Sequence, residues 1–279
     1  CALLLCGSLM GHAQAQDAAE TDTAVPAAFT LQVQAPETVS VWLQRHLELL
    51  RYKDLADLDA LELKRLLDGA DLQARELLAT LGYFSPRLNW QTEVTGLPAP
   101  RWRIRLQVEP GPVARISGVQ WVFEGHLQES DKHRALRQAL QRQWSLQAGQ
   151  AFTQDGWSLA KAQALRQLTA EHYPLGRWIH TEAQVDPAHN TVELRLALDS
   201  GPEVFLGPVV VQGQERYSLE QALRLANVPA GRSYRQTDLL EAQQRLVLSG
   251  FYDAVFVSLD TDGPPEAMPV RIELKETLR

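Results

Sequence analysis

The chain has 279 residues, a formal net charge of −7 and an isoelectric point near 5.5. With 45% hydrophobic and 22% charged residues, its composition is typical of globular protein and excludes a fibrous or largely disordered chain. Because nucleic-acid binding requires a positively charged surface, the acidic balance argues against a nucleic-acid partner.

The N-terminal residues carry the pattern of a secretory signal. An apolar stretch, residues 1–10, contains both cysteines and precedes Ala13-Gln14-Ala15, an A-x-A cleavage sequence. We predict a signal over residues 1–15, truncated at its start, with cleavage between Ala15 and Gln16. The mature chain would then lack cysteine and form no disulfide.

Other interpretations of the apolar stretch are weaker. A lipoprotein anchor at Cys6 would require a small residue before it, and Leu5 is bulky. A membrane anchor or buried helix is disfavoured because the stretch is shorter than the ~20 residues that span a bilayer, although a truncated start could conceal part of it. Residues 16–27 are small and polar, and we expect them to be a disordered leader.

The same order of elements recurs three times beyond the leader. Each unit has a short strand, two amphipathic helices and a hairpin of two strands. In chain order, the expected elements are residues 29–34, 39–50, 61–81, 84–94 and 101–109, then 113–123, 130–141, 152–173, 177–185 and 191–198, and finally 203–212, 218–226, 234–249, 251–259 and 269–276. The sequence therefore predicts an α+β fold of three tandem βααββ modules, each a three-stranded mixed sheet covered by two antiparallel helices.

Residue spacing identifies the last strand of each unit and the end of its second helix. Val270, Ile272 and Leu274 alternate with charged residues, as expected of a strand with one buried and one solvated face. In the first and third units the second helix ends at Gly82 and Gly250, because glycine readily supplies the left-handed residue that closes a helix. The middle unit instead has a proline close to this point.

Gly-Pro pairs mark the boundaries between the units. Gly111-Pro112 and Gly201-Pro202 each follow one predicted strand and precede the next. We therefore predict domains over residues 28–110, 111–200 and 201–279. Because proline fixes φ and glycine relaxes it, we expect these four residues to form restricted hinges.

The units resemble POTRA (polypeptide-transport-associated) domains, the periplasmic modules of the BamA/TamA outer-membrane assembly superfamily. The resemblance covers about residues 28–279 and rests on the βααββ order, the Gly-Pro junctions, and the joints L-G-Y-F (residues 81–84) and S-G-F-Y-D (residues 249–253). Three modules are closer to the TamA family than to BamA, which usually has five. In the TamA family a β-barrel follows the third module. Since no long series of alternating strands follows here, the chain is expected to be either a fragment truncated at both ends, from which the C-terminal β-barrel is missing, or a protein without a barrel. We favour the fragment, because the signal is also truncated.

This resemblance implies the periplasmic part of an outer-membrane protein or autotransporter assembly and translocation factor. The implied partners are unfolded outer-membrane proteins or autotransporters, and the implied location is the periplasm of a Gram-negative bacterium, attached to the outer membrane through a following barrel. A second interpretation is a docking scaffold that links such a barrel to an inner-membrane-anchored TamB-like partner, which the first module would meet. The POTRA region of a BamA-like or two-partner-secretion transporter is a third.

Client segments could bind as an added strand at a sheet edge. In the POTRA fold the first strand of the hairpin is an edge strand, whose unpaired N–H and C=O groups accept another chain with little sequence demand. Pro86 blunts the first such strand because it cannot donate a ladder hydrogen bond. The apolar residues 255–257 make the third edge strand the most prone to pair with another chain, unless these residues pack only on their own helices. The predicted contact residues are Trp178, His180, Glu182, Tyr252, Ala254, Phe256 and Ser258.

No motif predicts a catalytic residue, a metal site or a cofactor. The sequence contains no H-E-x-x-H, P-loop, G-x-S-x-G or G-x-G-x-x-G. His126 and His133, near Glu129 and Asp131, could suggest a metal cluster, but a polar loop at a helix start explains them. Trp42, Trp90 and Trp102 lie on apolar faces and are expected in the core, whereas Trp178, beside Ile179, is a candidate for an exposed ring. We therefore predict no enzymatic activity.

Overall fold

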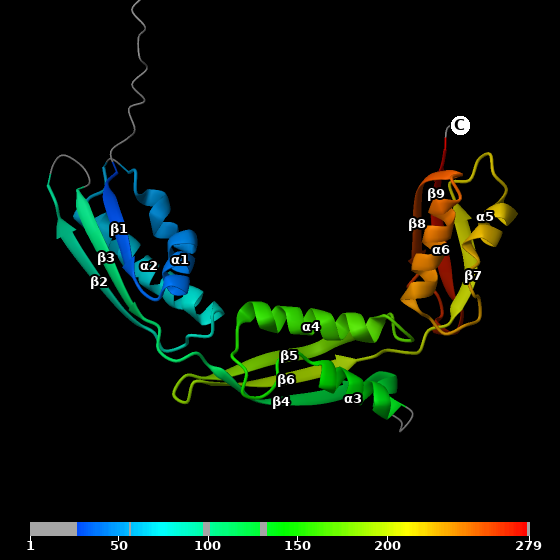
Figure 1. Cartoon of the computed structure of the whole chain (residues 1–279), viewed down its shortest axis with the longest axis horizontal. Helices are drawn as coiled ribbons and strands as arrows, with labels where there is room; N and C mark the ends of the chain where they lie inside the picture. The colour runs from blue at the N-terminus through cyan, green and yellow to red at the C-terminus, as the bar shows by residue number, and fades with distance from the viewer. Residues whose placement is uncertain (1–26, 56, 97–100, 129–132, 278–279) are drawn as a thin grey trace, which may run out of the picture.

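The structure, a computed structural model, describes residues 27–55, 57–96, 101–128 and 133–277 (Figure 1). The predicted signal, its cleavage site at Ala13, Ala15 and Gln16, and the leader up to residue 26 lie outside the described residues.

Three separate three-stranded sheets follow one another along the chain. Module 1 contains β1 (Phe29–Gln34), α1 (Glu37–His46), η1 (Glu48–Tyr52), α2 (Ala60–Thr80), β2 (Arg87–Val94) and β3 (Trp102–Glu109). Module 2 contains β4 (Arg115–Glu124), η2 (Gly125–Leu127), α3 (Arg134–Gln143), α4 (Gln154–Thr169), β5 (Arg177–Asp186) and β6 (Thr191–Asp199). Module 3 contains β7 (Leu206–Gln212), α5 (Leu219–Ala226), α6 (Gln236–Leu248), β8 (Tyr252–Leu259), η4 (Pro265–Ala267) and β9 (Met268–Glu276).

All three sheets have the same topology. The last strand of each module, β3, β6 or β9, is central; it pairs parallel with the first strand and antiparallel with the second. The predicted α+β class, with three βααββ modules built on mixed three-stranded sheets, is confirmed. In Figure 1 the modules form an open arc, with modules 1 and 3 rising from the two ends of module 2.

Several element boundaries differ from the prediction because side chains outside the helices are needed in the core. The helix expected over residues 39–50 ends at His46, since Leu47 adopts an extended conformation and is buried before the chain continues as η1. The helix expected over residues 152–173 spans only Gln154–Thr169. Its flanking rings, Phe152 and Tyr173, are buried outside the helix.

Each module packs a stripe of its second helix on the central strand. In module 1, Ala74 and Leu78 of α2 and Ile104 and Leu106 of β3 are fully buried in one core. The alanine brings the helix close to the sheet, and the leucine fills the space beside it. At about 25 cal/mol per Å² of apolar surface removed from water, this layer supplies most of the stability of a small module.

A glycine at the end of α2 joins modules 1 and 2. Gly82 has φ 90°, and its carbonyl oxygen accepts a hydrogen bond of 2.8 Å from the N–H of Ala114. A Cβ atom on Gly82 would collide with the carbonyl oxygen of Phe152. Ser85 adds a hydrogen bond of 3.1 Å from its hydroxyl to the carbonyl oxygen of Pro187. The joint therefore requires glycine for both its backbone conformation and its close approach.

A histidine occupies the corresponding place between modules 2 and 3. His172 has φ 64°; its N–H donates to the carbonyl oxygen of Tyr234, and its carbonyl oxygen accepts from the N–H of Val204, each at 2.8 Å. Its Nδ1 atom lies 2.6 Å from Ser233 Oγ, which donates to Glu203 Oε1 at 2.9 Å. Main-chain pairing on both sides thus holds a residue other than glycine in a left-handed conformation.

The predicted hinge residues lie between these sheets. Gly111 and Gly201 have φ values of 74° and 63°, the region that glycine adopts most readily. Pro112 and Pro202 follow them, just before β4 and β7. Hinge behaviour and the exact domain boundaries stay predictions.

A carboxylate in module 3 closes the loop between β7 and α5. Glu276, at the end of β9, accepts hydrogen bonds from the backbone N–H groups of Glu215, Arg216 and Tyr217. Desolvation raises the pKa of this carboxyl group, but the three N–H donors together with the charge of Arg216 outweigh it, so the pKa is lowered.

We predict that Gly82→Ala loosens the joint between modules 1 and 2. The new Cβ would collide with Phe152, and alanine in the left-handed conformation itself costs about 1 kcal/mol. Gly250→Ala is the matched control, since Gly250 has φ 74° but open space around its Cβ position. Small-angle scattering should show a changed mean shape for Gly82→Ala and an unchanged one for Gly250→Ala; equal profiles would contradict this account.

Glu276 should make module 3 less stable in acid. Since its folded-state pKa lies below the ordinary value of 4.5, its contribution is complete above that value and is lost as the pH falls through the lowered pKa. Glu276→Gln should lower the free energy of unfolding at neutral pH. It should also weaken the fall of that free energy with decreasing pH, as measured by urea unfolding from pH 7 to 3. Glu273→Gln, on the other face of β9, should keep the wild-type profile.

Candidate functional site

Each sheet leaves one long strand edge open. The second strands, β2, β5 and β8, pair with the central strand on one side only. The first strands are also edge strands, but the loop before the second helix covers their starts through backbone hydrogen bonds. These bonds run from Ala28 to Lys53, from Ile116 to Gln150 and from Leu206 to Arg232. The open edges of β2, β5 and β8 therefore form the candidate site.

The β2 edge is blunted, as Pro86 predicts. Pro86 lies immediately before β2, and its carbonyl oxygen accepts a hydrogen bond of 3.0 Å from the guanidinium group of Arg75 on α2. The indole N–H of Trp90 is turned towards the same helix and donates to Asp71 at 3.0 Å. Hydrogen bonds between α2 and the segment of β2 thus occupy polar groups along this strand.

The β5 edge contains a bulge that changes the predicted site. The pairing with β6 shifts between Trp178 and His180, so that Ile179 is the extra residue and is 47% exposed. Trp178 is only partly exposed; its indole N–H donates to the carbonyl oxygen of Lys161 on α4, and its ring lies 6.0 Å from that of Trp121. Trp178 is thus half-buried, and the bulge turns its neighbour Ile179 outward instead.

The remaining predicted residues of β5 lie on the open face of the sheet. Glu182 is 3.6 Å from Arg195 of β6 and 3.7 Å from His180. These side chains are well exposed, so each pair contributes only about 0–1 kcal/mol and can be displaced. His180 and Glu182 therefore remain accessible beside the open backbone of β5.

The β8 edge divides its predicted residues between the two faces. Tyr252 is buried, and desolvation, followed by the nearby Glu276 and Tyr217, raises its pKa. It therefore belongs to the core and is not a contact residue. Ala254, Phe256 and Ser258 are on the other face; Phe256 is 59% exposed.

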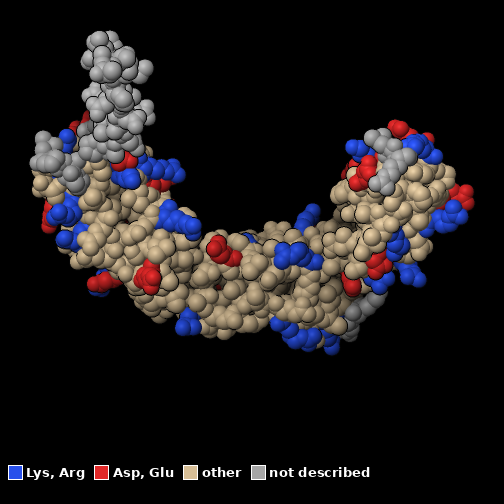
Figure 2. All heavy atoms as spheres, turned by 45° about the horizontal axis from the view of Figure 1, so that its top comes forward, with Lys and Arg blue, Asp and Glu red and all other residues tan. Residues whose placement is uncertain are grey.

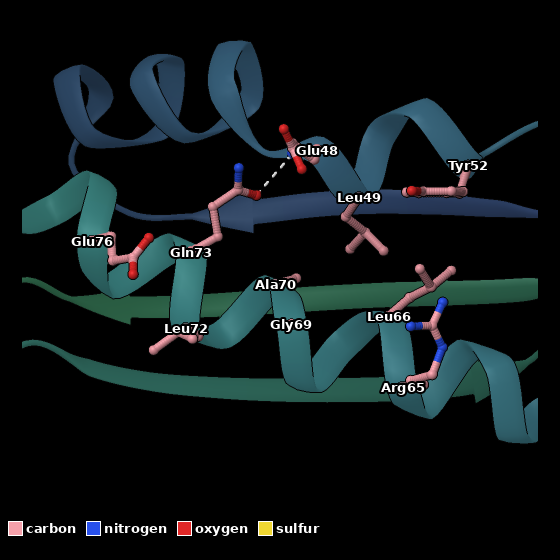
Figure 3. A pocket seen from close by; sticks show the side chains of 10 residues that line it. All are labelled: Glu48, Leu49, Tyr52, Arg65, Leu66, Gly69, Ala70, Leu72, Gln73 and Glu76. Atoms are coloured by element: carbon pink, nitrogen blue, oxygen red, sulfur yellow. Dashed lines mark hydrogen bonds between the residues drawn. The ribbon is translucent and has the colours of Figure 1, made fainter.

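Module 1 also carries a groove between η1 and α2, with a volume of about 430 Å³ (Figure 3). Leu49, Tyr52 and Leu66 line its apolar part, and Gln73 accepts a hydrogen bond of 2.9 Å from the backbone N–H of Glu48 on its rim. Gly69 lies in the middle of α2 with no atom within 4 Å of its Cβ position. A glycine at such a place weakens the helix by about 1 kcal/mol and leaves its backbone open to close approach.

Two other kinds of site, a metal site and a membrane-spanning helix, find no support among the described residues. No group of three or more His, Cys, Asp or Glu side chains suited to a metal ion occurs among the described residues, and Glu129 and Asp131 lie outside them. Of the described helices, none combines the length and apolar character that a membrane crossing requires. On the face shown in Figure 2, positive and negative side chains are scattered over all three modules.

Comparisons with known proteins identify the modules. A family model of TamA POTRA domain 1 matches residues 36–110. The solved structure of BamA POTRA domains 3–5 from Haemophilus influenzae aligns with 90% of this chain and 96% of that chain, at a TM-score of 0.50 and 16% identity. Residues 36–110 are thus similar to a TamA POTRA domain, and the chain as a whole has the fold of tandem POTRA domains.

Two other solved structures align less closely. POTRA domains 1–3 of the periplasmic domain of Omp85 from Anabaena cover 90% of this chain and 95% of that chain, at a TM-score of 0.33 and 15% identity. BamA from Haemophilus ducreyi lacking POTRA domains 1–3 aligns at a TM-score of 0.47 and 18% identity over 58% of this chain, which spans 29% of that structure. No curated protein matches the chain in sequence.

Sequence reasoning missed the helix side chains that reach the POTRA strand edges. Arg75 on α2 bonds the carbonyl group before β2, and Gln243 on α6 accepts a hydrogen bond of 3.2 Å from the N–H of Val257 in β8. Polar residues on a helix are normally assigned to its solvated face, and no local pattern distinguishes one that reaches a strand edge.

The bulge in β5 predicts opposite roles for two neighbouring residues. Trp178→Ala should destabilise module 2 by about 3 kcal/mol, because it removes a large ring from the core. Ile179→Ala should change stability by less than about 0.5 kcal/mol, because the side chain is largely in water. Urea unfolding of the two variants measures both values, and a larger loss for Ile179→Ala would contradict the bulge.

Proposed function

We propose that the chain is the periplasmic part of an outer-membrane protein assembly and translocation factor, and that it binds extended client segments as added strands at β5 and β8. The observation that carries this proposal is the second strand of each sheet, which is paired on one side only. A row of unpaired N–H and C=O groups recognises any extended backbone.

Backbone recognition suits clients that share no sequence. An unfolded outer-membrane protein or autotransporter exposes its own backbone groups, and pairing with an edge strand satisfies them without ATP or any reactive side chain. Side chains next to the edge would add only modest preference. The role is accordingly that of a binding module, with no enzymatic step.

The position of the edges favours β5 and β8 over β2. In Figure 1, β8 faces the inside of the arc and β2 lies on its outside, whereas β5 is the strand of module 2 nearest to the inside and lies beneath α4. β2 is also preceded by Pro86 and bonded by Arg75. A client lying inside the arc would therefore meet the edge of β8 directly and that of β5 beside α4.

The groove of module 1 supports a second role as a docking scaffold. Its mixed polar and apolar lining and the uncovered helix backbone at Gly69 suit a protein partner that packs closely against α2. The partner proposed is a TamB-like protein anchored in the inner membrane. The two roles use different modules, so they are compatible and can be tested apart.

A crosslinking scan tests client binding. Photo-crosslinkers at His180 and Glu182 of β5, and at Phe256 and Ser258 of β8, should trap an unfolded outer-membrane protein. Exposed helix positions Leu159 and Leu240 serve as controls. If the strand positions give no more adducts than the helix positions, strand addition is excluded.

Filling the groove tests docking. Gly69→Leu should raise the stability of module 1 by about 0.5–1 kcal/mol, because leucine is a far better helix former than glycine. It should also abolish capture of the periplasmic part of a TamB-like partner in a pull-down. Lys64→Leu, on the exposed surface of α2 outside the groove, should leave capture unchanged. Normal capture by Gly69→Leu would rule out the groove.

A further inference from the structure

The three second helices share one pattern of buried residues. In each, an alanine is followed four residues later by a leucine and eight residues later by a residue with positive φ. The three sets are Ala74, Leu78 and Gly82; Ala164, Leu168 and His172; and Ala242, Leu246 and Gly250. The residue directly after the alanine is therefore equivalent in the three modules. We call it the gate position, and it is occupied by Arg75, Leu165 and Gln243.

In module 3 the gate position is bonded to the strand edge. The side-chain oxygen of Gln243 accepts the N–H of Val257 at 3.2 Å. Along an antiparallel ladder, alternate residues direct their N–H and C=O groups to the partner strand and the others direct them away. Since the N–H of Val257 bonds to the helix, it belongs to the outward set, in the middle of β8.

An added strand must use that same N–H. It would pair with the outward groups of Val257 and of its neighbours Val255 and Leu259, two residues to either side. While Gln243 holds the central donor, an incoming carbonyl group cannot accept it. Gln243 thus competes directly with strand addition at β8.

In module 2 the gate position cannot compete. Leu165 has no polar atom in its side chain and packs partly in the core of module 2. The residue of β5 equivalent to Val257 is Thr181, which opposes Leu196 of the central strand as Val257 opposes Ile272. No side chain from the gate position can therefore bond the main chain of Thr181.

We propose that the gate position sets which module accepts a client strand. Leu165 leaves β5 open, whereas Gln243 guards β8, so an extended segment adds to β5 first and to β8 only after Gln243 swings away. In module 1, Arg75 binds the carbonyl group at the start of β2 and guards that edge from the acceptor side. This proposal rests on the proposed function and names the edge at which it begins.

The size of the effect follows from one hydrogen bond. A single neutral hydrogen bond of this kind changes an equilibrium by about 2- to 10-fold. Gln243 therefore biases the choice between modules 2 and 3 without closing β8 completely. A segment already held at β5 could still displace it.

The test exchanges the gate residues between modules. The probe is a ten-residue peptide, Lys-(Val-Thr)₄-Lys, and photo-crosslinkers at Glu182 and Ser258 report its addition to β5 and β8. Gln243→Leu should raise the ratio of β8 to β5 adducts about 2- to 10-fold. Leu165→Gln should raise the same ratio by reducing adducts at β5.

Matched variants separate the gate from general effects. Gln244→Leu, one residue along α6 and exposed, should keep the wild-type ratio. Gln243→Glu keeps an acceptor oxygen and should leave β8 guarded. Faster amide exchange at Val257 in Gln243→Leu would report independently that the guarding bond has been removed.

The outcomes distinguish the gate from the proposed function. If adducts form at β5 and β8 but their ratio stays the same in Gln243→Leu and Leu165→Gln, the proposed role of the gate position is wrong. Strand addition itself would remain supported. No adduct above the level of a helix control, in any variant, overturns both.

Discussion

The structure of this chain depends on one constraint, namely that each module has a sheet of only three strands. In a three-stranded sheet only the central strand has two partners, so every module must bury one face under its helices and still leave an edge strand half paired. The helices, loops and bulges that act on those edges determine whether the molecule stays soluble and what it can bind. The proposed function uses the backbone groups that these edges leave unpaired.

The modules treat the same edge differently. Pro86 and Arg75 blunt β2, a bulge at Ile179 interrupts one end of β5, and Gln243 occupies the centre of β8. A long, uninterrupted and unguarded edge would invite uncontrolled pairing between copies of the chain. On the proposed function, partial protection would leave each edge available to a client whose backbone pairing displaces the protecting side chain.

Elements with a strict period could be predicted from the sequence. The alternation of Val270, Ile272 and Leu274 follows directly from a strand with one buried face, and the glycines at 82 and 250 close their helices in the expected left-handed conformation. Prediction from the sequence fails where contacts with residues distant in the sequence determine the local structure. Leu47 leaves its helix to reach the core, and the bulge beside Trp178 depends on pairing with β6.

The joint between modules 2 and 3 determines how the edges of β5 and β8 lie relative to each other. His172 pairs through its backbone with both Val204 and Tyr234, which fixes module 3 to the end of module 2. On the proposed function, a client bound at β5 would present its next segment to β8 at a raised effective concentration, and this would offset the modest bias imposed by Gln243. The proposed order of binding would then follow from the joint and one hydrogen bond, without an energy source.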